Sequence, residues 1–451
     1  MGIYTSQKCD ELGVETRVPL LYFSRSSSSV LSLYRAYAIL SQNRIILMAL
    51  IIQKFGGTSV GTLDRIRRVA EIISEAKQAG HDVVIVVSAM SGETDRLIQM
   101  ANQLSVNPNA REYDALVSTG ECVSAALLAI ALAEKGISAC SLTGRQARVF
   151  TTEAHRRAHI THISVDAIKG LLAENKIPVV TGFQGVNAMG DVTTLERGGS
   201  DTSAVALAAA LKADECQIYT DVAGVYTSDP RVITNARLLD RITYTEMLAL
   251  SSLGAKVLHR QAVEFAKKNH IPVRVLSSFE LGTGTLITGV DVVKKPFVSG
   301  VALDRRQIKL SILGIPKKNN GLYYFLEFMN DANFDIDMTV QNHSSSEDTV
   351  DFIFTVHCDD YQNAISFSEI IAKKIEAREV IVDDQIAKLS LVGLGMESHA
   401  GVASKIFQTL GSQNIPIYLI TSTDAKISTI IDEKHLEAGA RLLHGAFDLG
   451  V

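Results

Sequence analysis

The sequence has no tryptophan, only eight prolines and only five cysteines in 451 residues. No CxxC pair occurs among the cysteines, which excludes a zinc ribbon and a disulfide scaffold and favours a reducing, cytoplasmic location. Lysine and arginine (44) do not outnumber aspartate and glutamate (49), so the chain lacks the basic excess of a protein that coats nucleic acid. Uncharged apolar runs of about 18 residues, the length of a membrane span, are also missing. We therefore expect neither nucleic acid nor membrane as a partner.

Apolar residues are plentiful, at 47% of the chain, while charged residues make up only 21%. This composition supports large hydrophobic cores and excludes a disordered or collagen-like chain. The length indicates about three domains. The apolar segment 125–133 ends at Glu134 and Lys135, so we predict a buried core helix there.

The first 47 residues differ from the rest. Between Arg17 and Met48 there are four arginines and no acidic residue, which is typical of a transit peptide. Asp10, Glu11 and Glu15 argue against such a signal, and a dispensable leader or a translation start at Met48 explains the segment as well. We predict a poorly structured extension over 1–47.

Residues 48–290 alternate between apolar runs and segments of helical spacing. The run Val83-Val-Ile-Val-Val87 is apolar at successive positions, as in parallel strands buried on both faces. Further strands are predicted at 50–53, 179–181, 217–220 and 273–275, and helices at 63–73, 202–211 and 245–253. This alternation predicts an α/β sandwich in which helices cover a mostly parallel sheet.

The C-terminal part contains an internal repeat of about 80 residues. The stretch Ile308-Lys-Leu-Ser-Ile-Leu-Gly314 returns as Ala387-Lys-Leu-Ser-Leu-Val-Gly393. The first copy, 305–385, reads β-α-β-β-α-β with a helix at 322–331, whereas the second copy is one strand short. We predict that strand 297–303 completes the second unit, which then comprises 297–304 and 386–451. Both units have the pattern of split ferredoxin-like folds.

The sequence Lys54-Phe-Gly-Gly-Thr-Ser-Val60 stands between a predicted strand and a predicted helix. Two glycines let the backbone approach an anion, the helix N-terminus offers free N–H groups, and Lys54 adds a positive charge. The pattern is neither GxxxxGK[ST] nor GxGxxG, which disfavours a P-loop or a dinucleotide fold. A phosphate cradle or an ordinary turn fits equally well on this evidence alone.

Three further motifs lie at predicted strand or helix ends. Arg197-Gly-Gly-Ser-Asp201 combines a carboxylate-binding arginine with another glycine pair. Ser118-Thr-Gly-Glu121 places an acid at a helix start, either as a partner for an ammonium group or as a favourable N-terminal charge. Thr220-Asp221 and the turn-rich loop to Arg231 follow a strand, where open α/β sheets bind ligands.

Together with Gly254-Ala-Lys-Val-Leu258, these motifs resemble those of the aspartate kinases, within the amino acid kinase family, over nearly all of residues 48–451. The resemblance implies a catalytic domain at 48–290 and two C-terminal ACT domains. It also implies ATP-dependent phosphorylation of the aspartate β-carboxylate to 4-phospho-L-aspartate, the first step of lysine, threonine and methionine biosynthesis.

The resemblance further implies roles for single residues. Lys54 and Asp201 would form the catalytic pair, and Mg²⁺ would bridge the phosphates of ATP. Aspartate would be bound by Ser59, Thr94, Glu121, Phe183 (through its backbone), Arg197 and Ser200. ATP would be held by Lys54, Gly56, Gly57, Thr220, Asp221, Tyr226, Arg231 and Lys256.

Regulation is implied in the same way, through lysine or threonine as effector. Gln341 and Asn342 match the family's effector-side signature, whereas Lys317 stands where an acidic residue is typical and would repel an ammonium group. ACT domains normally cover their sheet edges with a second chain, so we expect a homodimer or a larger homo-oligomer.

Two alternatives remain at this point. A sister enzyme of the fold would phosphorylate N-acetylglutamate or a nucleoside monophosphate, and a silent amino-acid sensor would use the kinase fold without catalysis. His155, His159 and His162 have metal-site spacing, but Arg156 and Arg157 would repel a cation, so we predict hydrogen-bonding histidines and no protein-built metal site.

Overall fold

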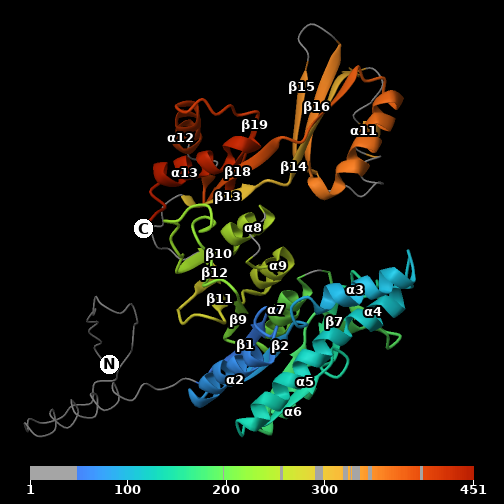
Figure 1. Cartoon of the computed structure of the whole chain (residues 1–451), viewed down its shortest axis with the longest axis vertical. Coiled ribbons are helices and arrows are strands. Elements are labelled where there is room, and N and C mark those ends of the chain that lie inside the picture. Colours follow the sequence, from blue (N-terminus) through green and yellow to red (C-terminus); the bar gives the residue numbers. More distant parts are fainter. Residues whose placement is uncertain are drawn as a thin grey trace, which may run out of the picture. The chain divides into compact units, whose positions relative to one another are not determined.

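The computed structural model describes residues 48–451 except 197, 254–256, 290–297, 318–322, 326, 328–335, 344–347 and 397–399 (Figure 1). Residues 48–451 form one compact unit. The extension predicted over 1–47 lies outside the described residues.

A large sheet organises the first half of this unit, and eight of its strands are described. In spatial order they are β10 (Arg241–Thr243), β12 (Thr285–Thr288), β11 (Val273–Ser277), β9 (Glu215–Thr220), β1 (Leu50–Phe55), β2 (Asp82–Val87), β6 (Ile177–Thr181) and β3 (Ala139–Leu142). All neighbours pair in parallel except β11 and β12. The predicted mostly parallel α/β sheet is thus confirmed.

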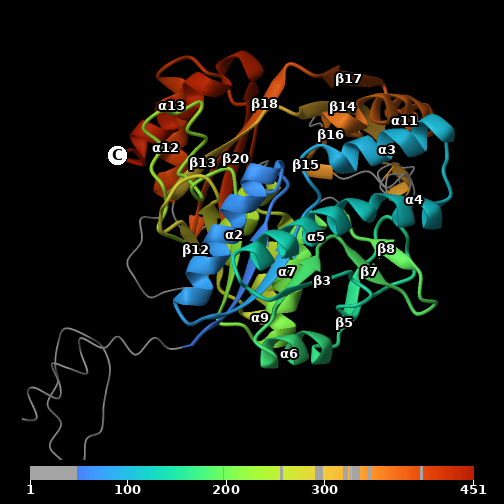
Figure 2. The same cartoon turned by 60° about the horizontal axis from the view of Figure 1, so that its bottom comes forward.

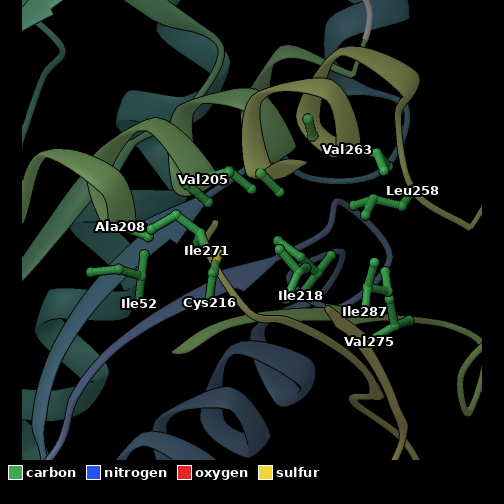
Figure 3. Close-up of a cluster of buried hydrophobic side chains, with 14 of the residues drawn as sticks. Ile52, Val205, Ala208, Cys216, Ile218, Leu258, Val263, Ile271, Val275 and Ile287 are labelled. Atoms are coloured by element: carbon green, nitrogen blue, oxygen red, sulfur yellow. The ribbon is translucent and has the colours of Figure 1, made fainter. Parts of the chain in front are cut away.

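Alternate residues of each central strand enter two different cores. In β2, Val83, Ile85 and Val87 pack toward one face, whereas Val84 and Val86 pack toward the other. The first face is covered by α2 (Leu63–Gln78) and α5 (Thr119–Glu134) (Figure 2). The second is covered by α7 (Gly199–Leu211), α8 (Tyr244–Ser252) and α9 (Arg260–Asn269). Figure 3 shows side chains of α7 and α9, such as Val205 and Val263, beside those of the strands. Burial on both faces explains why β2 shows no polar alternation.

Local hydrogen bonds fix where the helices begin. The Thr62 side chain accepts the N–H of Arg65 at the start of α2. Thr243 and Glu246 form a reciprocal capping box at the start of α8. The helix α7 begins after Gly198, whose φ of 83° lies in the left-handed region that glycine favours.

A second, smaller sheet was not predicted from the sequence. It has the order β5 (Ile160–Ile163), β4 (Val149–Thr151), β7 (Gln184–Val186) and β8 (Val192–Thr194). Three of these strands have only three residues each, too few to show a period of two. In the sequence, α3 (Glu93–Leu104) and α4 (Ala110–Val117) precede these strands, and α6 (Asp166–Ala173) lies between β5 and β7.

Two antiparallel four-stranded sheets form the C-terminal half and confirm the two predicted ferredoxin-like units. The first has the order β15 (Ile336–His343), β16 (Thr349–His357), β14 (Gln307–Pro316) and β17 (Glu379–Asp383), with α11 (Tyr361–Lys374). The second has the order β13 (Val298–Asp304), β18 (Ile386–Gly393), β20 (Lys426–Asp432) and β19 (Leu419–Thr423), with α12 (Ala400–Gly411) and α13 (Leu436–Ala446).

The strand β13 has the same place in the second sheet that β17 has in the first, next to the first strand of the repeat. This pairing supports the assignment of 297–304 to the second unit, although the domain limits as a whole stay a prediction. The helix predicted at 322–331 lies largely outside the described residues.

The helices α4 and α5 together span Ala110–Glu134, a stretch long and apolar enough by composition to cross a membrane. One face of α5 is nevertheless inside the protein, since Leu128 and Leu132 are fully buried against the large sheet and α2. The opposite face carries Val123 and Ile130, which are exposed. This burial supports the prediction of a core helix.

Truncation of Leu128 tests that interpretation. We expect Leu128→Ala to lower the free energy of unfolding by about 2–5 kcal/mol, because it leaves a cavity in the core between α5 and the sheet. The matched change Ile130→Ala, on the exposed face of α5, should alter it by less than about 0.5 kcal/mol. Thermal melts of both variants would decide. Equal destabilisation would contradict the assignment of the two faces.

Candidate active site

The carboxyl ends of β1, β2 and β6 border a cavity of about 490 Å³. Ligands of open α/β sheets bind at this edge. Its lining includes seven residues implied by the family resemblance: Lys54, Gly57, Thr94, Glu121, Phe183, Ser200 and Asp201. The fold therefore brings together groups that are up to 147 positions apart in the sequence, from residue 54 to residue 201.

A buried ion pair lines the cavity. The ammonium nitrogen of Lys54, near the end of β1, is 2.6 Å from a carboxylate oxygen of Asp201, in the first turn of α7. The side chains are only 10% and 12% exposed. The other carboxylate oxygen of Asp201 accepts the N–H of His259 at 3.3 Å. The pair therefore holds a positive charge at a fixed position beside a helix N-terminus.

The turn after β1 comes very close to the neighbouring chain. A Cβ atom on Gly57 would lie 2.9 Å from the carbonyl oxygen of Ala89, so only glycine fits there without a shift. The N–H of Gly56 is donated to the Tyr219 carbonyl at 3.1 Å, whereas no backbone carbonyl of the described residues accepts that of Gly57. Gly57 is thus the better placed of the two to donate to an anion.

Glu121 is a buried carboxyl at the start of α5. One of its oxygens accepts the N–H of Ala89 at 3.1 Å, and the other has no partner among the described residues. Burial raises the pKa of Glu121 from its ordinary value of 4.5 to about 7, against the opposing effect of the Ala89 hydrogen bond. A cationic ligand group beside Glu121 would satisfy the free oxygen and favour the ionised form.

Phe183 and Ser200 line the same cavity as Glu121. Phe183 has a φ of 66°, unusual for a residue with a side chain, and its N–H is donated to the Ser203 hydroxyl at 3.1 Å. Its carbonyl accepts the N–H of Leu195 at 2.9 Å. A left-handed residue held from both sides fixes the backbone at the cavity.

Tyr113 and Arg156 are among the lining residues that had not been predicted. The Arg156 guanidinium lies 4.2 Å from the centre of the Tyr113 ring, and its chain is anchored by Asp114, which accepts the Arg156 N–H at 3.1 Å. Asp114 is fully buried and also binds His155 at 2.7 Å, so this histidine is a hydrogen-bonding residue. The sequence 155–157 did not indicate that Arg156 lines this cavity, because the residues that contact it belong to α4.

The other residues implied by the resemblance lie elsewhere. Ser59 is buried, and its hydroxyl bonds to Ser278 at 2.8 Å. Thr220 is the last residue of β9, and its hydroxyl donates to Asp221 at 3.1 Å. Tyr226 packs against the core of the second antiparallel sheet. The remaining positions are exposed on the surface or lie outside the described residues: Arg231, Gln341 and Asn342 are exposed, and Arg197 and Lys256 are not described.

The combination of a glycine turn, a buried lysine and a helix N-terminus at a sheet edge is suited to phosphoryl transfer. The sequence profile of the amino acid kinase family matches residues 49–277, and that of an ACT domain matches residues 389–447.

Individual relatives agree with these profiles. An aspartokinase of Pseudomonas aeruginosa is 53% identical over 405 residues, which cover 89% of this chain and 98% of that protein. An aspartate kinase structure from Synechocystis is 42% identical, with a TM-score of 0.50, and the match covers 89% of this chain and 70% of that one. Escherichia coli aspartokinase III with aspartate and ADP shares the fold at 24% identity, a TM-score of 0.70 and coverages of 88% and 99%.

The chain therefore belongs to the amino acid kinase family and, within it, to the aspartokinases with C-terminal ACT domains.

The raised pKa of Glu121 predicts a pH-dependent stability. Between about pH 4.5 and 7 the folded protein keeps Glu121 protonated while the unfolded chain ionises it, so the free energy of unfolding falls as the pH rises through this window. The full shift corresponds to roughly 3 kcal/mol. Glu121→Gln keeps the acceptor for Ala89 and cannot ionise, so it should be more stable than the parent at pH 8 and equal to it near pH 4.

Denaturant titrations at both pH values measure this difference. Glu112→Gln, at an exposed position in α4, is the control and should show no such pH dependence. An unchanged stability of Glu121→Gln at pH 8 would contradict the raised pKa.

Proposed function

We infer that this protein is an aspartate kinase, which transfers the γ-phosphoryl group of ATP to the β-carboxylate of L-aspartate and forms 4-phospho-L-aspartate. The observation that carries this inference is the buried Lys54–Asp201 pair in the same cavity as Glu121, one carboxylate oxygen of which has no hydrogen-bond partner among the described residues. One side of the cavity is suited to a phosphoryl group and the other to an ammonium group. The product enters the biosynthesis of lysine, threonine and methionine.

The acceptor needs no general base. A carboxylate with an ordinary pKa near 3.9 is already ionised at neutral pH, so nothing has to remove a proton from it. The barrier comes instead from bringing one anion onto another. Catalysis therefore depends on positioning and on neutralising the charge of the transferred group.

The residues of the cavity divide these tasks. Lys54 places its ammonium group on the transferred phosphoryl group, and Asp201 positions Lys54 rather than acting as a base. Gly57 donates its N–H to the phosphates. Glu121 binds the α-ammonium group of aspartate, and Arg197 binds its α-carboxylate.

A free ammonium group is what separates aspartate from the acceptors of sister enzymes. N-acetylglutamate lacks this group, and its amide would leave the buried oxygen of Glu121 without a cationic partner. Thr94, Ser200 and the backbone of Phe183 complete the aspartate pocket, because all three line the cavity with Glu121. Ser59 would act indirectly, by positioning the turn after β1, since its hydroxyl is bonded to Ser278.

ATP is held along the carboxyl ends of β1 and β9 in this proposal. Gly56 donates its N–H to the Tyr219 carbonyl there, and Thr220, Asp221, Tyr226, Arg231 and Lys256 follow in the chain. Mg²⁺ prefers oxygen ligands and is usually held by substrate phosphates with one or two carboxylates. Asp201 is the carboxylate beside Lys54 and fits that need, and the ion would neutralise phosphate charge when bound.

Regulation and assembly complete the proposal. The ACT profile at 389–447 supports control by an amino acid such as lysine or threonine, with Gln341 and Asn342 on the exposed part of β15 as effector contacts. Lys317 pairs with Asp348 at 3.6 Å, so its charge is partly neutralised. We also propose a cytoplasmic homo-oligomer joined through the ACT sheets.

The variant Asp201→Ala tests the catalytic pair. We expect turnover to fall by about 10²–10³-fold or more, because Lys54 loses the partner that positions it. Asp64→Ala is a matched control, since Asp64 also stands in the first turn of a helix but is exposed. Initial rates of ATP-dependent aspartyl hydroxamate formation measure both. Near-normal turnover of Asp201→Ala would refute the assigned mechanism.

The variant Arg197→Ala should mainly raise the KM for aspartate, by about tenfold or more, since it removes a charged hydrogen bond to the α-carboxylate. The KM for ATP should change little. Arg157→Ala, which changes an exposed arginine that pairs with Glu196, serves as the control. A selective loss of ATP affinity in Arg197→Ala would assign Arg197 to the nucleotide instead.

A further inference from the structure

Arg156 lines the cavity of Lys54, and the proposed function leaves it without a role. It stands in the loop between β4 and β5, whereas the groups that hold its side chain come from an earlier part of the chain. Its Nη2 donates to the Pro108 carbonyl at 2.6 Å, and its guanidinium carbon lies 4.2 Å from the centre of the Tyr113 ring. These two contacts hold the end of the side chain in one place at the cavity.

The backbone of Arg156 has a conformation that few residues with a side chain adopt. Its φ of 66° lies in the left-handed region, which favours glycine. The fully buried carboxylate of Asp114 holds this conformation, because both of its oxygens lie 3.1 Å from the Arg156 N–H. The same carboxylate accepts the N–H and the hydroxyl of Thr194 in β8, at 3.1 and 2.6 Å. A long charged side chain at a position suited to glycine is most simply explained by a task of that side chain.

The guanidinium of Arg156 has more donors than partners. An arginine side chain carries five N–H donors. The structure gives this one a single hydrogen bond, to Pro108, and its Nε is buried with no hydrogen-bond partner among the described residues. The Asp114 carboxylate accepts the backbone N–H and not the guanidinium. Because a buried charged donor without an acceptor is costly, an anionic ligand group is favoured beside it.

The charges around the cavity also favour an anion at Arg156. Among the described lining residues the cations are Lys54 and Arg156, and the acids are Asp95, Glu121 and Asp201. Lys54 is paired with Asp201 at 2.6 Å, whereas no carboxylate of the described residues pairs with Arg156. A planar guanidinium matches the two oxygens of a carboxylate. Arg156 is therefore suited to a carboxylate of the substrate.

We propose that Arg156 is a further substrate-binding residue, which donates charged hydrogen bonds to the α-carboxylate of the amino-acid substrate. The choice of the α-carboxylate rests on the proposed function. The β-carboxylate has to meet the phosphoryl group beside Lys54 and Gly57, whereas the contacts of Arg156 belong to residues 108–114. A carboxylate has about four acceptor sites, so it accepts hydrogen bonds from Arg156 and Arg197 together.

This assignment makes Arg156 a binding residue and not part of the chemical step. Phosphoryl transfer changes the β-carboxylate, while the α-carboxylate has the same charge before and after the reaction. Hydrogen bonds to the α-carboxylate therefore stabilise the bound substrate and the transition state equally. Loss of such uniform binding raises KM and leaves kcat unchanged.

The variant Arg156→Gly tests the proposal. It removes the guanidinium, and glycine suits the left-handed backbone, so we expect the variant to fold. The KM for L-aspartate should rise by at least about tenfold, with kcat and the KM for ATP within about twofold of the parent. Arg156→Lys keeps the positive charge without the planar fork and should recover part of the loss. A fall in kcat with an unchanged KM for aspartate would overturn the proposal.

Arg148→Gly is the matched control. Arg148 also has a left-handed backbone, with a φ of 54°, but it is exposed and does not line the cavity. The same substitution there should leave the KM for aspartate unchanged. Thermal melts of both glycine variants show that they fold.

A substrate without the α-carboxylate charge separates a direct contact from an effect of Arg156 on the fold. With the α-amide of L-aspartate, the KM of the parent should already be high, and Arg156→Gly should alter it by less than about threefold, because the contact is absent in both. An equal rise in KM for aspartate and for its α-amide would show that Arg156 acts only through the fold, and would overturn the proposal.

Binding without turnover keeps this test separate from the proposed reaction. Calorimetric titration with L-aspartate, in the presence of a non-hydrolysable ATP analogue, should show binding to the full chain that is about tenfold weaker in Arg156→Gly. Equal affinities would overturn the role of Arg156 and leave the proposed function standing. Weaker binding in the variant, with no aspartyl hydroxamate from the parent, would contradict the proposed function and support the contact. No binding by the parent would overturn both.

Discussion

The ion pair between Lys54 and Asp201 is the interaction on which the rest of the site depends. It joins the end of β1 to the first turn of α7. These residues are far apart in the sequence and come together through the parallel sheet. Burying two charges costs desolvation that their attraction repays only when the geometry is good and further hydrogen bonds are made. The His259 N–H on Asp201 is one such bond. A pair retained at that cost is most simply explained by a need for a fixed positive charge.

The same pair also connects catalysis to the C-terminal half of the chain. His259 precedes α9, and α9 lines a second cavity, formed with the two antiparallel sheets. Other contacts tie these parts together, such as the hydrogen bond from Ser299 in β13 to Glu246 in α8 and that between Thr227 and His444 in α13. Regulatory sheets attached in this way can influence Asp201 through packed helices, without a ligand near the substrate.

The sequence alone predicted much of the fold because its strongest signals are local. Fully apolar strands such as 83–87, and glycine pairs next to predicted strand ends, mark a parallel sheet and its ligand edge. The repeat likewise revealed two similar units. The small sheet of β4, β5, β7 and β8 was missed because strands of three or four residues carry too little pattern.

The candidate site was predicted only where motif and geometry coincide. Lys54, Glu121 and Asp201 meet in one cavity, as the resemblance implied they should. Arg156 was missed because Asp114 and Tyr113, which hold it, lie more than 40 positions away. In the segment 220–231, by contrast, residues close together in the sequence point to different places. Tyr226 packs toward another core, and Arg231 pairs with Asp229 on the surface.

The central claim is that the cavity of Lys54, Asp201 and Glu121 phosphorylates a free amino acid at its β-carboxylate. The most direct measurement is ATP-dependent hydroxamate formation by the full chain with L-aspartate, compared with N-acetyl-L-aspartate and N-acetyl-L-glutamate. The account predicts a hydroxamate product with L-aspartate and little with either acetylated compound, since neither offers an ammonium group to Glu121. Equal rates with the acetylated compounds, or no product with L-aspartate, would contradict it.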